Sequence, residues 1–193
     1  MLDCSPPVSH QRSTGAASVR LGTDARGALR IGGLAQAGSA KAFLPRVHGV
    51  LPEVVFLNTS GGLTGGDRLS YSLALEAGTA AVGTTQTAER AYRSTGPAPA
   101  HMAVRLDLGP GAQLDWLPQE TILFEGANLA RRTEARLAGD ARLLMLEILV
   151  LGRAAMGETL AQVACHDLRH VSRDGVPVLI EPVRLTTATL ARS

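Results

Sequence analysis

The glycine-rich segment NTSGGLTGGDRL, residues 58–69, has a spacing that could do chemistry: Gly61 and Gly66 match the first and last glycines of a phosphate-binding loop. In that loop a lysine follows the last glycine and neutralises the phosphate, whereas here Asp67 follows and would repel it. The next residues, Leu69–Leu75, alternate apolar and polar side chains, which predicts a strand instead of the required helix. We therefore predict no nucleotide site, and we assign structural turns to the four glycines Gly61, Gly62, Gly65 and Gly66.

The Asp67 carboxylate has two interpretations. An aspartate that follows two glycines often accepts a hydrogen bond from nearby backbone in a turn. Alternatively, its oxygens serve as metal ligands or as an anchor for a partner protein. The sequence leaves both interpretations open, so Asp67 is a candidate metal-contacting residue.

Glu147 lies in the most apolar segment of the chain, Leu143–Leu151 (LLMLEILVL), which we interpret as one continuous strand. Both faces of that strand are apolar, and a lone carboxylate there is costly unless it is paired. One hypothesis is a buried ion pair, for which Arg153, Arg93 and Arg105 are the candidate partners. The other hypothesis is that the Glu147 carboxylate lies on a metal transit path or on a surface that contacts a partner.

The segment CHDLRH contains Cys165, His166 and His170, whose thiolate and imidazole groups suit nickel or zinc. A structural zinc site needs four ligands, and the only other cysteine is Cys4. The sequence thus gives weak support to a metal site here. It also contains neither G-x-S-x-G nor H-E-x-x-H, and Ser60 lacks the strand-to-helix setting of a nucleophile, which argues against a hydrolase.

The elements that must position these residues are short apolar runs bounded by glycine, proline or aspartate, which are typical of strands. Only Thr87–Arg93 suggests a helical turn. The predicted strands are Val54–Leu57, Leu69–Leu75, Val104–Leu108, Gln113–Leu117 and Leu143–Leu151. We therefore predict a mainly β protein with very few helices.

Three segments repeat the order strand, small turn, strand, and their turns centre on Gly78, Gly111 and Asp140. The turns are 33 (111 − 78) and 29 (140 − 111) residues apart. Repetition at this period predicts a coiled, β-helix-like stack of short strands, with a β-sandwich as the alternative. No composition shift divides the chain, so we expect residues 1–193 to form a single domain.

Composition excludes several classes of function. The net charge of the 193 residues is +2 and the arginines are scattered, which gives no support to nucleic-acid binding. Two cysteines cannot form a disulfide framework, which favours a reducing compartment. The first residues do not resemble a signal peptide, and Leu143–Leu151 is too short for a membrane helix. We expect a cytoplasmic protein with no membrane contact.

Four long motifs in the central part of the chain, together with their order, resemble the UreD (UreH) family of urease accessory proteins. The resemblance covers about residues 11 to 185. The motifs are NTSGGLTGGDRL (58–69), TTQTAERAYRS (84–94), LDWLPQETILFEGANL (114–129) and LGRAAMGE (151–158).

This resemblance implies a largely β, coiled scaffold without catalytic activity and without a permanently bound cofactor. It implies contact with urease apoprotein and with UreF, which recruits the GTPase UreG, so that nickel in transit reaches the urease active site. Asp67 and Glu147 fall in motifs where the family offers acidic residues to the proposed nickel route. Family members continue beyond LTTATLARS, so we expect this chain to lack the family's C-terminal part.

The alternative function is that of a β-solenoid enzyme acting on a polysaccharide or a small molecule. Such an enzyme typically needs two facing carboxylates and aromatic side chains that stack on sugar rings. The chain has one tryptophan, two tyrosines and three phenylalanines, which argues against a sugar cleft. We therefore predict that the protein is not an enzyme.

Overall fold

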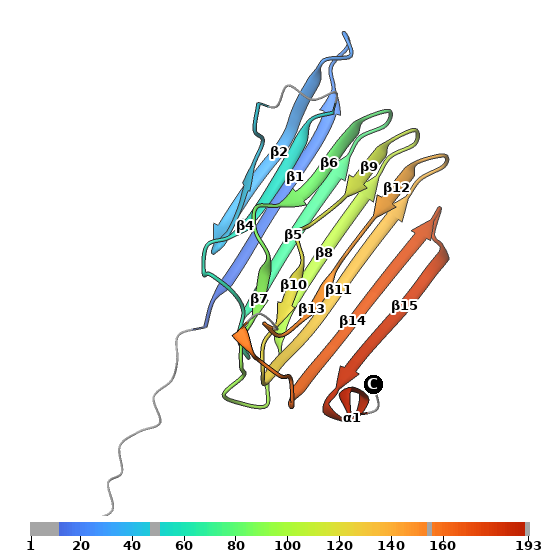
Figure 1. The fold of residues 1–193 in the computed structure, drawn as a ribbon. Helices are drawn as coiled ribbons and strands as arrows, with labels where there is room; N and C mark the ends of the chain where they lie inside the picture. Colours follow the sequence, from blue (N-terminus) through green and yellow to red (C-terminus); the bar gives the residue numbers. More distant parts are fainter. Residues whose placement is uncertain (1–11, 47–50, 154–155, 192–193) are drawn as a thin grey trace, which may run out of the picture.

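The computed structural model describes residues 12–46, 51–153 and 156–191, and Cys4 lies outside these ranges. In the described residues nearly all of the regular secondary structure is β-strand, with one short α-helix, α1 (Thr187–Leu190), at the end of the chain (Figure 1). No helix within them is long and apolar enough to span a membrane.

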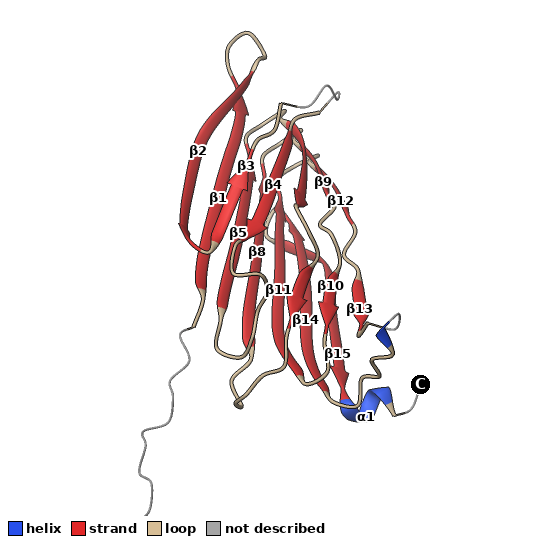
Figure 2. Ribbon diagram, turned by 60° about the vertical axis from the view of Figure 1, so that its left-hand side comes forward, coloured by secondary structure: helices blue, strands red, loops and turns tan. Residues whose placement is uncertain are grey.

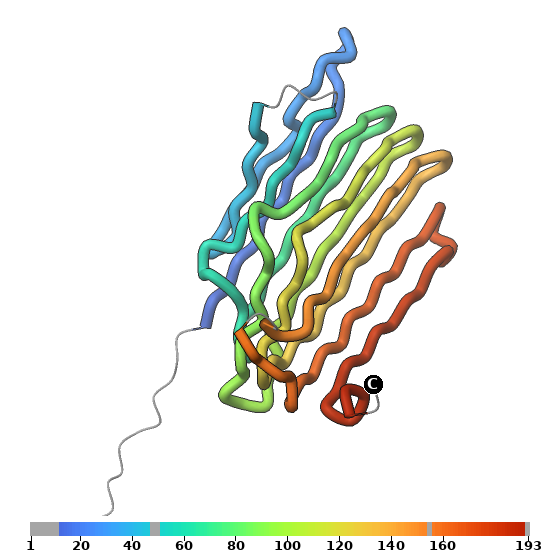
Figure 3. The backbone as a smooth tube through the Cα atoms, in the orientation of Figure 1, coloured from blue at the N-terminus to red at the C-terminus, as the bar shows by residue number. Residues whose placement is uncertain are grey.

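The centre of the molecule consists of three consecutive coils, whose path is clearest in the backbone tube (Figure 3). Each coil contributes a long strand to one sheet, a shorter strand to a second sheet and a three-residue strand to a third. In chain order the coils are β5 (Arg68–Leu75), β6 (Ala80–Thr85) and β7 (Glu89–Ala91); β8 (Ala100–Leu108), β9 (Gln113–Trp116) and β10 (Thr121–Leu123); β11 (Ala127–Leu137), β12 (Arg142–Met145) and β13 (Leu149–Leu151).

Antiparallel strand pairs extend both ends of this stack (Figure 2). Before the coils lie β1 (Thr14–Thr23), β2 (Leu29–Gly38), β3 (Ala40–Phe43) and β4 (Glu53–Asn58), and after them lie β14 (Val163–Arg173) and β15 (Val176–Thr186). The long sheet has the strand order β15-β14-β11-β8-β5-β1-β2, the second sheet β12-β9-β6-β4-β3 and the short sheet β13-β10-β7.

Strands of successive coils pair in parallel, and the prediction of a β-helix-like stack is confirmed. Leu73 pairs with Leu106, 33 residues later (106 − 73), and Leu106 pairs with Ala135, 29 residues later (135 − 106). These offsets equal the spacing of the predicted turns. The turns stack side by side at one end of the molecule, where the Gly111 N–H donates to Asp140 Oδ1 at 2.7 Å (Figure 1).

Two local predictions are wrong. Thr87–Arg93 contains no helical turn, because Glu89–Ala91 forms β7 and pairs with β10 in the short sheet. Leu143–Leu151 is not one strand, since the ladder stops between Met145 and Leu149. There the chain crosses from the second sheet to the short sheet, so the corner of the coil interrupts the hydrogen bonding while the side chains keep alternating.

The core fills the space between the sheets with leucine, valine and alanine and a single cluster of rings. Phe56 stacks on Tyr71 with ring centroids 4.8 Å apart and meets the edge of Trp116 at 6.0 Å. Gly83 lies against this cluster, and a Cβ there would come within 2.8 Å of the Trp116 ring. A glycine at this position therefore lets the tryptophan fit between the sheets.

Candidate functional site

Four charged side chains meet inside the solenoid, and we call them the ion cluster: Arg131, Glu147, Asp167 and Arg169. Arg131 and Asp167 are register partners on the adjacent parallel strands β11 and β14. On these strands every second residue faces the core, including Leu129 and Cys165. Because successive side chains of a strand point to opposite faces, Arg131 and Asp167 both point into the interior, among neighbours that are apolar or small.

A two-pronged ion pair forms the deepest part of the cluster. Arg131 donates from Nε to Asp167 Oδ1 at 2.9 Å and from Nη2 to Oδ2 at 2.6 Å. Its remaining nitrogen, Nη1, donates to Thr121 Oγ1 at 3.1 Å. Burial alone would lower the pKa of Arg131, but the hydrogen bonds to Asp167 and the charge of Glu147 outweigh burial and raise it. The guanidinium is therefore held in its charged form.

Glu147 enters the cluster from the corner between β12 and β13, with its side chain only 2% exposed. Its Oε2 accepts from Arg169 Nε at 2.7 Å and lies 3.6 Å from Arg131 Nη2. Its Oε1 accepts from Thr133 Oγ1 at 3.0 Å and from Trp116 Nε1 at 3.3 Å. Both carboxylate oxygens are thus occupied, and two negative charges balance two positive charges in the interior.

Arg169 connects the cluster to the surface. Besides Glu147 and Asp167, it binds Glu181 of β15 through Nη1 at 3.0 Å, and the Glu181 side chain is 52% exposed. The inner face of β14 and β15 extends past the last strands of the other two sheets, β12 and β13. A row of alternating charges therefore leads from the buried Asp167 to solvent at this end of the solenoid.

The predicted partners of Glu147 were wrong, although it does form a buried ion pair with arginine. Arg153 pairs with Glu158 at 3.0 Å, Arg93 lies 3.8 Å from Glu125, and Arg105 lies 3.8 Å from Glu134. The true partners, Arg131 on β11 and Arg169 on β14, point into the core, whereas Arg105 lies on the exposed outer face of the neighbouring strand β8. No local pattern around Glu147 points to them.

Asp67 stands apart from the ion cluster, at the start of β5, and β8 lies between β5 and β11 in the long sheet. It is buried, and its oxygens accept backbone N–H groups of Ser13 and Thr64, both at 2.8 Å. The carboxylate thus ties the glycine-rich segment to the residue that precedes β1. In this arrangement Asp67 and Glu147 share no partner.

The glycines beside Asp67 lie in the bends and turns between β4 and β5. Gly61, Gly62 and Gly66 have φ values of 81°, 148° and 90°, which other residues rarely adopt. Gly65 has an ordinary φ, but a Cβ there would lie 1.9 Å from Ser94 Oγ. Backbone conformation and close contact therefore account for all four glycines.

A further buried carboxylate, Glu89 on β7, was not singled out from the sequence. It accepts a hydrogen bond from Asn58 Nδ2 at 3.1 Å and lines a small enclosed cavity with Phe56 and Tyr71. Burial raises the pKa of Glu89 to about 7, and the bond from Asn58 only partly opposes this. The available signal was the alternation within residues 89–91, which the expectation of a helical turn obscured.

The cysteine and histidines of β14 do not converge. Cys165 faces the core, where burial raises the pKa of its thiol to about 11, while His166 is exposed on the opposite face of the strand. His166 and His170 share that outer face but are separated by about 13 Å along the strand. No group of three metal-binding side chains occurs among the residues that the structure describes.

Comparison with known proteins gives one consistent result. The family model described as UreD urease accessory protein matches residues 14–193. Proteins named urease accessory protein UreD from Cereibacter sphaeroides and Dinoroseobacter shibae are 60% and 59% identical over 94% of this chain, and one from Jannaschia sp. is 52% identical over 100% of it. The aligned parts cover 65%, 64% and 70% of those relatives, so the chain spans about two thirds of their length.

Proposed function

The chain belongs to the UreD family of urease accessory proteins, and from that membership we propose that it is a non-catalytic maturation factor of urease. In this role it binds urease apoprotein and UreF, and through UreF the GTPase UreG, so that nickel reaches the urease active site. The observation that carries the proposal is the family match over residues 14–193. A buried free thiol at Cys165 agrees with work in the reducing cytoplasm.

The architecture supports a scaffold role. Parallel ladders join every coil to the next, and one buried hydrophobic cluster runs through all three coils. The buried carboxylates Glu147 and Asp167 are both occupied by arginines, in contrast to the available acid and base of a glycosidase. The solenoid therefore offers rigid outer faces to partner proteins.

Nickel is cargo in this proposal, and Glu147 is its strongest contact candidate. A divalent cation that approaches along Glu181 and Arg169 meets carboxylates already arranged for positive charge. The ion would replace a guanidinium as the partner of Glu147, and because it carries two positive charges in place of one, the interior would gain one positive charge. Asp67 is the weaker candidate because both of its oxygens hold backbone N–H groups.

Co-expression with UreF, UreG and urease apoprotein, followed by purification through a tag on this chain, tests the proposal. We expect a stable complex and nickel-dependent urease activation that needs this chain. A complex that forms without this chain and activates urease equally well would overturn the scaffold role. Binding of partners without any gain in activation would retain the scaffold and remove nickel delivery.

A further inference from the structure

The outer face of the long sheet is exposed and carries an excess of arginine. On β1, β5, β8, β11 and β14 every second residue faces the core, so the residues between them point outward. The pairing register aligns these outward residues in rows across the sheet, one of which contains Arg68, His101 and His166. We call this surface the cationic face; its arginines are Arg20, Arg68, Arg105, Arg132, Arg136 and Arg184.

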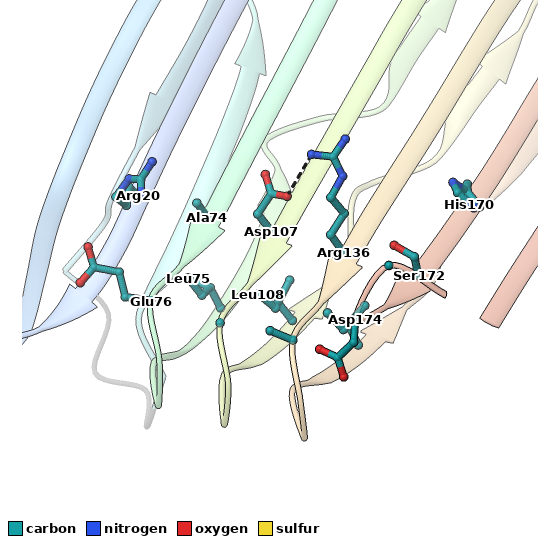
Figure 4. A pocket seen from close by; sticks show the side chains of 14 residues that line it. Arg20, Ala74, Leu75, Glu76, Asp107, Leu108, Arg136, His170, Ser172 and Asp174 are labelled. Atoms are coloured by element: carbon teal, nitrogen blue, oxygen red, sulfur yellow. Dashed lines mark ion pairs between the residues drawn. The ribbon is translucent and has the colours of Figure 1, made fainter. Parts of the chain in front are cut away.

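The charge of the whole chain is concentrated on this face. On the strands themselves six outward arginines stand against two outward acidic side chains, Asp107 and Glu134, an excess of four positive charges (6 − 2). Glu76 and Asp174, in the turns at one end of the sheet, also line the cavity of Figure 4. The chain has 19 lysines and arginines and 17 acidic residues, so everything outside the face has 13 and 15. The rest of the protein is therefore net negative, although the overall charge of +2 suggests a nearly neutral molecule.

The acidic side chains on the face do not neutralise it. Glu134 is shared by three arginines, with Arg132 at 2.5 Å, Arg136 at 3.6 Å and Arg105 at 3.8 Å. A hydrogen bond from Arg132 lowers the pKa of Glu134, so this carboxylate is permanently charged at neutral pH. Among the described residues Arg20 and Arg68 form no ion pair, which leaves their guanidinium groups available to an external anion.

The shape of the face suits close contact. Between the arginines the outward positions are occupied by small residues, so a partner can approach the sheet closely. Shallow cavities follow the face: one lies over Arg20, Asp107, Arg136 and His170 (Figure 4), and another over Ser70, Ser72 and Arg132. The small outward residues are Ala16, Ser18, Ser70, Ser72, Ala74, Ala103 and Ala130.

We infer that the cationic face binds an acidic surface of a partner protein, with the guanidinium groups paired to its carboxylates. A planar guanidinium donates two parallel hydrogen bonds to a carboxylate, and charge complementarity of this kind steers protein association. The inference deepens the proposed function, on which it rests, by stating where on the scaffold an acidic partner of the maturation assembly would sit and what that partner's surface must carry.

A nucleic acid fits this face less well. Its phosphates would follow one another every few ångströms, and Glu134 and Asp107 would oppose them in the middle of the face. The outward residues of the described long sheet from β1 to β14 include no phenylalanine, tyrosine or tryptophan on which a base could stack. A protein surface can instead place its own cations opposite these two carboxylates.

The first test measures binding of poly-L-glutamate to the full chain, which is independent of any named partner. The variant R20E/R68E reverses two exposed arginines that form no ion pair among the described residues, and the control R26E/R142E makes the same charge change at exposed positions off this face. We expect R20E/R68E to weaken binding about tenfold or more and the control to change it by less than about threefold. Circular dichroism confirms that both variants keep the strand signal.

Several results would overturn the inference. Equal weakening in both variants, or no binding of poly-L-glutamate by the unaltered chain, excludes a specific cationic face. Tighter binding of duplex DNA than of poly-L-glutamate, lost in R20E/R68E, would make the face a nucleic-acid site.

A second arm measures assembly with UreF and with urease apoprotein separately. We expect R20E/R68E to reduce assembly with one of them by about tenfold. Unchanged assembly with both overturns the inference while the proposed function stands. Failure of the unaltered chain to bind either protein removes the proposed function, and the poly-L-glutamate result still decides whether the face is specific.

Discussion

Two buried carboxylates in the same solenoid meet different chemical surroundings. Glu147 is bound by Arg169 and faces Arg131, so its charge is matched inside the protein. Glu89 has the neutral amide of Asn58 as its hydrogen-bond donor, and burial raises its pKa to about 7. Similar burial thus yields one carboxylate fixed in an ion cluster and another that binds a proton near neutral pH.

The two carboxylates differ because the strands next to them place different side chains beside them. β14 places Asp167 and Arg169 opposite β11, so the interior beside Glu147 contains complementary charges. The cavity around Glu89 is lined by Phe56, Tyr71 and polar side chains such as Thr85 and Thr87, but in the described part of the chain no arginine or lysine forms an ion pair with Glu89. The charge state of a buried carboxylate therefore depends on the side chains that adjacent strands place beside it, more than on the motif in which the residue lies.

Breaking the ion cluster should have the largest effect on stability. Arg131→Met removes the two-pronged partner of Asp167 and the donor to Thr121, and loss of one partner from a buried pair costs about 3–5 kcal/mol. Urea or thermal unfolding measures the loss. The control Arg136→Met removes exposed ion pairs, which contribute about 1 kcal/mol or less. Equal destabilisation by both variants would contradict a structural role for the cluster.

Glu89 should make stability depend on pH. Its pKa is raised in the folded state to about 7, above the unfolded value of about 4.3, so the folded protein binds more protons in that window. This contribution is complete below about pH 4.3 and is lost as pH rises through about pH 7, a total of about 4 kcal/mol. Glu89→Gln should flatten this dependence and stabilise the protein above about pH 7.

Unfolding measured at several pH values in parallel tests this expectation. Asp140→Asn, at an exposed turn, is the control, since its side chain only accepts the Gly111 N–H. A profile that Glu89→Gln leaves unchanged would show that Glu89 is ionised at neutral pH and that the contrast with Glu147 is absent.

The stack of coils could be predicted from the sequence because the turn residues recur along the chain with the period of one coil. The spacing of Gly78, Gly111 and Asp140 equals the pairing offset of the strands, since stacked turns must recur once per coil. The stacked fold therefore follows from turn residues and alternation alone. Periodicity could not reveal the corner at Glu147, because the alternation of side chains continues through it while the ladder stops.

The site was less accessible to sequence reasoning. Arg131 and Asp167 meet because β11 and β14 are offset by 36 residues (167 − 131), a step that differs from the two earlier ones. Nothing in CHDLRH distinguishes its aspartate from the cysteine and histidines that suggested a metal site. The nickel contacts predicted for Asp67 and Glu147 stay predictions, and the contacts of both residues show what a nickel ion would have to displace.

Glu147→Gln should have a smaller effect on stability than Arg131→Met. The glutamine oxygen can still accept from Trp116 and Thr133, while its amide faces Arg169. Arg169 keeps Asp167 and Glu181, so we expect a loss of about 2–3 kcal/mol. If Glu147 contacts nickel, urease activation per folded complex falls as well. Glu76→Gln, which disrupts an exposed pair with Arg30, serves as the control.

Activation and melting are measured on the same Glu147→Gln sample. A lower melting temperature with full activation would make the residue structural only. Normal melting and full activation together would remove Glu147 from both roles and leave Asp67 as the remaining candidate.

Asp67→Asn gives the smallest expected change and places a third buried carboxylate in the comparison. Asp67 has no cation partner in the described part of the chain; two backbone N–H groups satisfy it instead. An asparagine keeps one acceptor and turns its amide toward the other N–H, which costs about 1–2 kcal/mol. If the residue only fixes the turn, activation per folded complex is unchanged, because the glycine-rich segment keeps its other backbone bonds, such as Leu63 N–H to the Arg90 carbonyl. A loss of activation larger than the loss of folded protein would instead show that its charge, and not its turn, serves nickel delivery.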